Sequence, residues 1–147
     1  MAKTSERHTE LLNGFQAGNS RFVQWAREHF GDIRLASWEY GRISMVWEID
    51  DRFLMQDGVM FGGHVSSVAD LVTSLVAMTA LEDPKDRFRT SRLETNFFRP
   101  VMKPRLRIEG RVVNASKSLI HVEADFFNAE DKLAARIDAV QARRVAA

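Results

Sequence analysis

The sequence predicts an α+β fold in which an antiparallel sheet wraps around one long central helix, with an extra helix or helices at the N-terminus. Residues 62–81 are mostly apolar at helical spacing, and a helix that is apolar around most of its circumference is a buried helix. The segments on both sides of it alternate apolar and polar residues, which is typical of strands with one buried face. A sheet that curves around the helix buries both sets of apolar side chains in one core.

The composition narrows the class of protein. The chain has 147 residues and a formal net charge of +1, so it fits one domain and has no global field that favours nucleic acid. It has no cysteine, which excludes disulfides and cysteine-based zinc sites, and we expect no metal. No signal-peptide pattern is present, and no apolar run approaches the roughly 20 residues that span a bilayer. We therefore expect a cytoplasmic protein with no membrane or nucleic-acid partner.

Residues 5–30 have the apolar spacing of helices. Gly14 and Gly18 weaken the middle of this segment, because glycine in a helix interior costs roughly 1 kcal/mol, and Asn19-Ser20 is suited to cap a second helix. We assign residues 1–32 to an N-terminal helical extension and residues 33–147 to the main domain, within a single domain overall. No chemistry is evident in the extension, where His8 and His29 are expected to be exposed.

Residues 35–50 change to a strand pattern. Aromatic and β-branched residues are frequent here, and apolar side chains alternate with Arg42, Ser44 and Glu48. Gly41 marks a hairpin turn or a bulge. A loop over residues 53–61 then leads into the central helix, which we expect to cover residues 62–81 and to end before Pro84.

The last third of the chain alternates as strands do. The pattern predicts four strands, with turns at residues 114–117 and 128–131, and a polar, mobile loop over residues 85–89 before the first of them. The final segment, residues 133–139, is rich in alanine, so propensity alone also allows a helix. The simplest arrangement of these strands is a four-strand meander.

A polar stripe runs along the apolar central helix. Ser66, Asp70 and either Thr73 or Ser74 lie three or four residues apart and therefore share a face. Burying a carboxylate is costly unless it has a partner. Asp70 is therefore either a functional group or a carboxylate that neighbouring serines cap at a dimer interface. Because the apolar sides of the helix pack against the sheet, the polar stripe must face something else. We expect a second copy of the chain to be its neighbour.

Basic residues are concentrated between residues 85 and 111, where nine lysines and arginines accompany only three acidic residues. Such a local excess is suited to hold an anion such as a phosphate group, and a guanidinium fork matches phosphate well. Solvated strand faces explain the same pattern.

The order of elements and three motifs resemble the hotdog fold, and more narrowly the acyl-CoA thioesterase superfamily typified by 4-hydroxybenzoyl-CoA and phenylacetate-pathway thioesterases. The resemblance covers residues 35–144. It is carried by Gly62-Gly63 followed by Val68-Ala69-Asp70, by Thr95-Asn96-Phe97-Phe98-Arg99-Pro100, and by the strand motifs around Gly110, His121 and Leu133.

The resemblance implies hydrolysis of an acyl-CoA thioester by a homodimer or a homotetramer, with no cofactor, because CoA is part of the substrate. The thioester carbonyl is expected at the N-terminus of the helix, where an N–H of Gly62 or Gly63 and the helix dipole favour an oxyanion. Asp70 of the partner subunit is expected to act as general base or nucleophile. Thr90 matches the position of an assisting hydroxyl.

The sequence also departs from the family pattern. Phe61 stands where many relatives have histidine, and His64 follows the glycine pair instead. Met55 stands where many have asparagine or glutamine, and the adjacent Gln56 is the substitute. The expected catalytic residues are thus Asp70, Gly62, Gly63, Gln56 and Thr90. The expected substrate-binding residues are Met55, Phe61, His64, Ser74, Arg89, Arg92 and Arg99.

Two alternatives remain open on the sequence alone. One is a hotdog hydratase or dehydratase acting on acyl-CoA or acyl carrier protein, which needs a histidine paired with an acid; His64 and Asp70, six apart, lie on nearly opposite faces of a helix. The other is a non-catalytic acyl-CoA-binding protein, which the replacements at Met55 and Phe61 favour. Apolar residues near the helix suggest an aromatic or medium-chain acyl pocket, although core packing explains them equally well.

Overall fold

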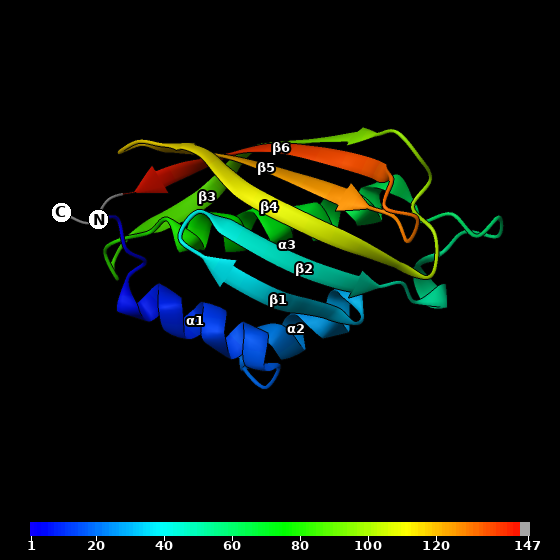
Figure 1. The fold of residues 1–147 in the computed structure, drawn as a ribbon, viewed down its shortest axis with the longest axis horizontal. Coiled ribbons are helices and arrows are strands. Elements are labelled where there is room, and N and C mark those ends of the chain that lie inside the picture. Colours follow the sequence, from blue (N-terminus) through cyan, green and yellow to red (C-terminus); the bar gives the residue numbers. More distant parts are fainter. Residues whose placement is uncertain (145–147) are drawn as a thin grey trace.

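The central helix and the sheet form as expected in the computed structural model, which describes residues 1–144 (Figure 1). Helix α3 spans Gly62–Thr79, beginning at the predicted residue and ending two residues before Leu81. The six strands are antiparallel and lie in the order β1-β2-β4-β5-β6-β3. Their bounds are β1 Ile33–Glu39, β2 Arg42–Glu48, β3 Arg87–Phe97, β4 Arg105–Ala115, β5 Leu119–Phe127 and β6 Leu133–Arg144.

The predicted four-strand meander is wrong at its first strand. Strands β4, β5 and β6 form a meander, but β3 pairs with β6 at the edge of the sheet, and β4 pairs with β2. The segment between β3 and β4 holds Pro100 and Pro104, which suit a crossing connection better than a tight hairpin. The predicted loop at residues 85–89 is also partly wrong, because pairing of Arg87 with Arg144 extends β3 into it.

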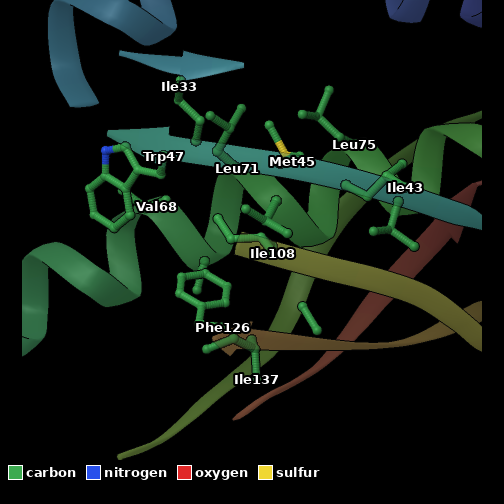
Figure 2. Packing of buried hydrophobic residues seen from close by; sticks show 14 of the residues in the cluster. Ile33, Ile43, Met45, Trp47, Val68, Leu71, Leu75, Ile108, Phe126 and Ile137 are labelled. Carbon is green, nitrogen blue, oxygen red and sulfur yellow. The ribbon is translucent and has the colours of Figure 1, made fainter. Parts of the chain in front are cut away.

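The core fills the concave side of the sheet against α3. Figure 2 shows Val68, Leu71 and Leu75 of α3 directed towards Met45 of β2, Ile108 of β4 and their neighbours. Gly110 of β4 allows the closest approach, because a Cβ built there lies 2.5 Å from Cγ2 of Val76. The alanine-rich segment at residues 133–139 is a strand, since β6 is paired on both sides and its small side chains are buried beneath the helix.

The N-terminal segment forms two helices, α1 (Glu6–Ala17) and α2 (Arg21–Phe30), with Ser5 and Ser20 as their N-caps. Gly18, with φ +80°, ends α1 in the left-handed conformation that favours glycine. In Figure 1 the two blue helices run beneath α3 and beside β1. Their apolar faces join the same buried cluster as the strands. The division at residues 32 and 33 stays a prediction, and residues 145–147 of the proposed main domain lie outside the described part.

Candidate active site

A hollow of about 650 Å³ lies between α3, the first half of β3 and the two N-terminal helices. Pockets of this size suit small-molecule ligands. From α3 it is lined by Ser67, Asp70, Leu71, Ser74 and Met78, which recur every three or four residues and therefore form one face of the helix. We refer to this hollow as the α3 groove.

Asp70 and Thr90 meet in the α3 groove. The hydroxyl of Thr90 donates a hydrogen bond of 2.7 Å to Oδ1 of Asp70, which joins α3 to β3. Asp70 is only partly buried, so it lies at the wall of the groove and not inside the core. One of its carboxylate oxygens is thus positioned by Thr90, and the hydroxyl of Ser74 stands one turn further along the same face.

The polar stripe runs through Ser74 and not through Thr73. Thr73 is fully buried, and its hydroxyl donates back to the carbonyl of Ala69 at 3.0 Å. Ser66 also faces away from the groove, because it donates to the hydroxyl of Thr95 on β3 at 2.9 Å. The stripe that lines the groove is therefore Ser67, Asp70 and Ser74.

The N-terminus of α3 carries free backbone donors. No side chain caps this helix, and the N–H groups of His64 and Val65 turn back to the carbonyl of Phe61. Within residues 1–144 no hydrogen bond uses the N–H of Gly62 or Gly63. Helix N-termini with free N–H groups attract negative charge. Gly63 is exposed, so these donors are open to a ligand.

One chain does not bring the two halves of the expected site together. Asp70 follows Gly63 by seven residues, which places it roughly 10 Å further along the helix axis. A carbonyl oxygen held by the N–H of Gly63 is therefore out of reach of Asp70 in the same chain. This separation fits the expectation that the two groups come from different subunits, which stays a prediction.

His64 lies in an aromatic cluster and not at the α3 groove. Its ring stacks on Phe53 with a centroid distance of 4.3 Å and lies near Phe30 and Trp47. Nε2 is buried without a hydrogen-bond partner among the described residues. Burial, followed by the positive charge of Arg52, lowers the pKa of His64 below 6.5, which favours a neutral ring.

Met55 and Gln56 are exposed on the loop before α3, and neither lines the α3 groove. Phe61 is also exposed, at 63%, and its ring lies against Gly63, where an added Cβ comes within 3.1 Å of Cε1. These three expected site residues thus surround the start of the helix, away from Asp70.

The three expected phosphate-binding arginines point to different places. Arg89 lines the α3 groove. Arg92 is engaged by Glu94 and Asp138 on the exposed face of β3 and β6. Arg99 donates to the carbonyl of Leu133 at 2.7 Å and lines a separate hollow of about 400 Å³, together with Gly62 and Phe97.

Of the two histidines expected to be exposed in the N-terminal segment, His29 is exposed, whereas the expectation for His8 is wrong. His8 is 5% exposed, because its ring packs at the end of the α3 groove with Nδ1 at 2.5 Å from Oγ of Ser5. The segment is also part of the candidate site, since Leu11, Phe22 and Trp25 line the groove. One feature of the sequence could have indicated this role, namely the width of the apolar face of residues 21–30. Phe22 and Trp25 extend this face beyond the residues that the structure buries, Val23, Ala26 and Phe30.

Residues 57–135, more than half of the chain, match the family model described as the thioesterase superfamily. The chain belongs to the thioesterase superfamily. This matched region contains α3, β3 and the Asp70–Thr90 pair. A Saccharolobus solfataricus protein named "Putative esterase SSO2140" is 33% identical over 107 residues, which cover 73% of this chain and 75% of that protein.

Solved structures of this superfamily share the fold. A thioesterase from Haemophilus influenzae superposes with a TM-score of 0.78 at 20% identity, covering 97% of this chain and 94% of its own. A thioesterase family protein from Silicibacter pomeroyi gives 0.79 at 20% identity, covering 95% and 99%. A Streptococcus pneumoniae protein, described as a hypothetical thioesterase with coenzyme A, gives 0.74 at 16% identity, covering 84% and 97%.

The family assignment confirms the hotdog fold and the expectation of a thioester hydrolase as the class of enzyme. Among residues 1–144, no three His, Asp or Glu side chains gather closely enough to hold a metal ion. In the same residues, no helix is both long and apolar enough to cross a bilayer.

Proposed function

We propose that this thioesterase hydrolyses an acyl-CoA to the free acid and CoA, with Asp70 as the general base or nucleophile. The observation that carries the proposal is the 2.7 Å hydrogen bond from Thr90 to Asp70 at the wall of a groove large enough for an acyl group. The bond holds one carboxylate oxygen in place, which leaves the other for the reaction. Positioned acid–base groups contribute about 10²- to 10⁴-fold to rates.

In the general-base route, Asp70 takes a proton from water while the water oxygen attacks the thioester carbonyl carbon. The carbonyl oxygen becomes an oxyanion, which the N–H of Gly62 or Gly63 stabilises. The carbon–sulfur bond then breaks, and the proton leaves with the CoA thiolate. In the nucleophilic route, the carboxylate attacks the carbonyl carbon, and the carbon–sulfur bond breaks to release the CoA thiolate. Water then hydrolyses the resulting anhydride to the free acid and the Asp70 carboxylate, and the proton that is released goes to the thiolate.

The site is completed by a second copy of the chain in a homodimer, which allows further pairing to a tetramer. Strand β3 lies at the edge of the sheet, where unpaired backbone groups are available to another strand. Exposed aromatic side chains of Phe61, Phe97 and Phe98 gather near the start of α3. Exposed apolar patches of this kind mark interaction surfaces.

The CoA portion of the substrate is recognised by its phosphates. Of the three expected arginines, Arg89 at the α3 groove and Arg99 beside Gly62 lie near the proposed reacting groups. Coenzyme A is named in the description of the Streptococcus pneumoniae structure. The hydratase alternative loses support because His64 is enclosed by Phe30, Trp47 and Phe53 and does not face Asp70.

The decisive experiment measures release of free thiol from short, long and aromatic acyl-CoAs. We expect Asp70→Asn to lower kcat by about 10²- to 10⁴-fold, because the amide neither accepts the proton nor attacks the carbonyl. Asp83→Asn is the matched control, since Asp83 is exposed after α3 and does not line the groove.

Wild-type rates in Asp70→Asn rule out the proposed mechanism. Binding of CoA esters by the wild type without any thiol release supports the non-catalytic alternative instead. Hydration of an enoyl-CoA without thiol release supports the hydratase.

A further inference from the structure

The α3 groove extends well beyond the proposed reacting groups. Asp70 and Met78 both line it, and eight residues of helix separate them by roughly 12 Å. The N-terminal helices run in the opposite direction to α3 along this distance. The N–H of Ser5 donates to the carbonyl of Leu81, just after the end of α3. The ring centroids of Phe30 and His64, near the start of α3, are 6.0 Å apart. The groove is therefore an elongated channel with Asp70 nearer one end.

The wall that α1 and α2 contribute to the channel is apolar where Leu11, Phe22, Trp25 and Phe30 line it. Phe88 of β3 lies across from these residues. Trp25 is 46% exposed, yet its ring is held by Phe22 at 6.4 Å and by Phe30 at 6.0 Å between centroids. A wall of mutually packed aromatic rings is pre-organised to accept apolar surface.

Near the C-terminus of α3 the channel is lined by polar groups that already have partners. His8 is bonded to Ser5, Arg7 donates to the carbonyl of Pro84 at 3.2 Å, and Asp86 is paired with Arg143 at 3.0 Å. The start of α1 is itself fixed, because the hydroxyl of Thr4 donates to the carbonyl of Thr79 at 2.6 Å. The lining at this end is therefore polar and held in place by its own hydrogen bonds, so contact with it does not favour an apolar chain.

We propose that the α1–α2 pair sets the length of the acyl group that this enzyme accepts, and that the preferred substrate has a medium-length, apolar acyl chain. The thioester lies at Asp70, the chain follows α3 between Leu11 and Phe88, and its methyl end stops before His8. This inference rests on the proposed function, because it takes the thioester carbon to be the atom beside Asp70.

Leu11 is the residue that tests the channel most directly. It is partly exposed, it lines the channel one turn from His8, and its replacement does not touch the Asp70–Thr90 pair. Leu11→Trp fills the far part of the channel, and Leu11→Ala widens it. One methylene in an apolar pocket is worth about 10- to 200-fold in specificity.

The experiment measures kcat/KM for a ladder of straight-chain saturated acyl-CoAs from acetyl to palmitoyl. We expect Leu11→Trp to reduce kcat/KM for the longest good substrate by about tenfold or more while short chains stay unaffected. We expect Leu11→Ala, which widens the side wall and leaves His8 in place, to keep the length limit of the wild type. Leu119→Trp is the control, because Leu119 is a partly exposed leucine of β5 outside the channel.

A second variant, Met78→Trp, narrows the same part of the channel from α3 and gives an independent test if Leu11→Trp folds poorly. An unchanged chain-length profile in folded Leu11→Trp and Met78→Trp variants overturns the inference while leaving the proposed function intact. An equal shift in Leu119→Trp also overturns it. If the wild type cleaves no member of the ladder and no aromatic acyl-CoA, the proposed function itself has failed.

Discussion

At the scale of single residues, the contrast between Asp70 and His64 decides how the site is interpreted. Both were singled out beside the glycine pair, six positions apart on one helix. Asp70 accepts a hydrogen bond from Thr90 and lines the groove, whereas His64 stacks on Phe53 and has a buried nitrogen without a partner. A functional group with access to a ligand is therefore found at Asp70, and His64 serves packing in this chain.

The buried His64 gives the protein a specific dependence of stability on pH. Because burial and Arg52 lower its pKa in the folded state, the unfolded chain binds a proton more readily below pH 6.5. The stabilising preference for neutral His64 is thus present above pH 6.5 and is lost as the pH falls towards the folded-state pKa. We expect His64→Phe to flatten this part of the curve in denaturant unfolding followed between pH 7 and pH 5.

His29 provides the control for this measurement, because it is exposed on α2. His29→Phe should leave the slope of stability against pH unchanged over the same interval. A slope in His64→Phe equal to that of the wild type would show that the histidine contributes no proton linkage. His8, whose pKa is also lowered by burial and then by Arg7, contributes a slope of the same sign.

At the scale of elements, local patterns predicted the helices and strands well but not their neighbours. The alternation in residues 93–98 and 133–139 predicted two strands, which the structure extends to 87–97 and 133–144, because side-chain period depends on the strand itself. That these two strands pair depends on the path of the connection through Pro100 and Pro104, which no periodicity records. Similarly, the spacing within α3 placed Asp70 on a polar face, but only the fold brought Thr90 and Trp25 to that face.

The contact between α3 and β4 depends on the absence of a side chain at Gly110. A Cβ there lies 2.5 Å from Cγ2 of Val76 and 3.2 Å from Cγ1 of Ile43, so one of the elements must shift. We expect Gly110→Ala to lower the free energy of unfolding by about 1–3 kcal/mol, as overpacked cores do. Chemical denaturation measures the change.

A double-mutant cycle provides the control. Val76→Ala alone creates a cavity, but it removes the atom that the new methyl group meets. The double variant Gly110→Ala, Val76→Ala should therefore be more stable than the sum of the single changes predicts. Strict additivity of the two changes would mean that the clash is not the cause.

At the scale of the whole molecule, the proposed site is divided between two chains, and this division is testable by mixing inactive variants. Gly63→Pro removes the N–H donor while proline remains tolerated in the first turn of a helix. We expect Gly63→Pro and Asp70→Asn each to be inactive as homodimers. After unfolding and refolding together in equal amounts, half of the dimers are mixed, and each mixed dimer has one intact site.

Thiol release from the mixture should then recover to about a quarter of the wild-type rate, as follows from two-fold symmetry. Refolding each variant alone by the same procedure is the control. If the mixture stays inactive although mixed dimers form, Asp70 and Gly63 do not act across the interface.

The two N-terminal helices have a consequence for how substrate choice is encoded in the chain. The family match covers residues 57–135, which contain the proposed reacting groups, whereas Leu11, Phe22 and Trp25 lie before it. If the proposed channel is correct, the reacting groups lie within the matched residues, whereas one wall of the channel comes from residues before them. Mutations in the first thirty residues are free to retune the substrate range without altering Asp70 or Thr90. Natural or engineered substitutions in the N-terminal helices can therefore change substrate selectivity without replacing the proposed catalytic residues.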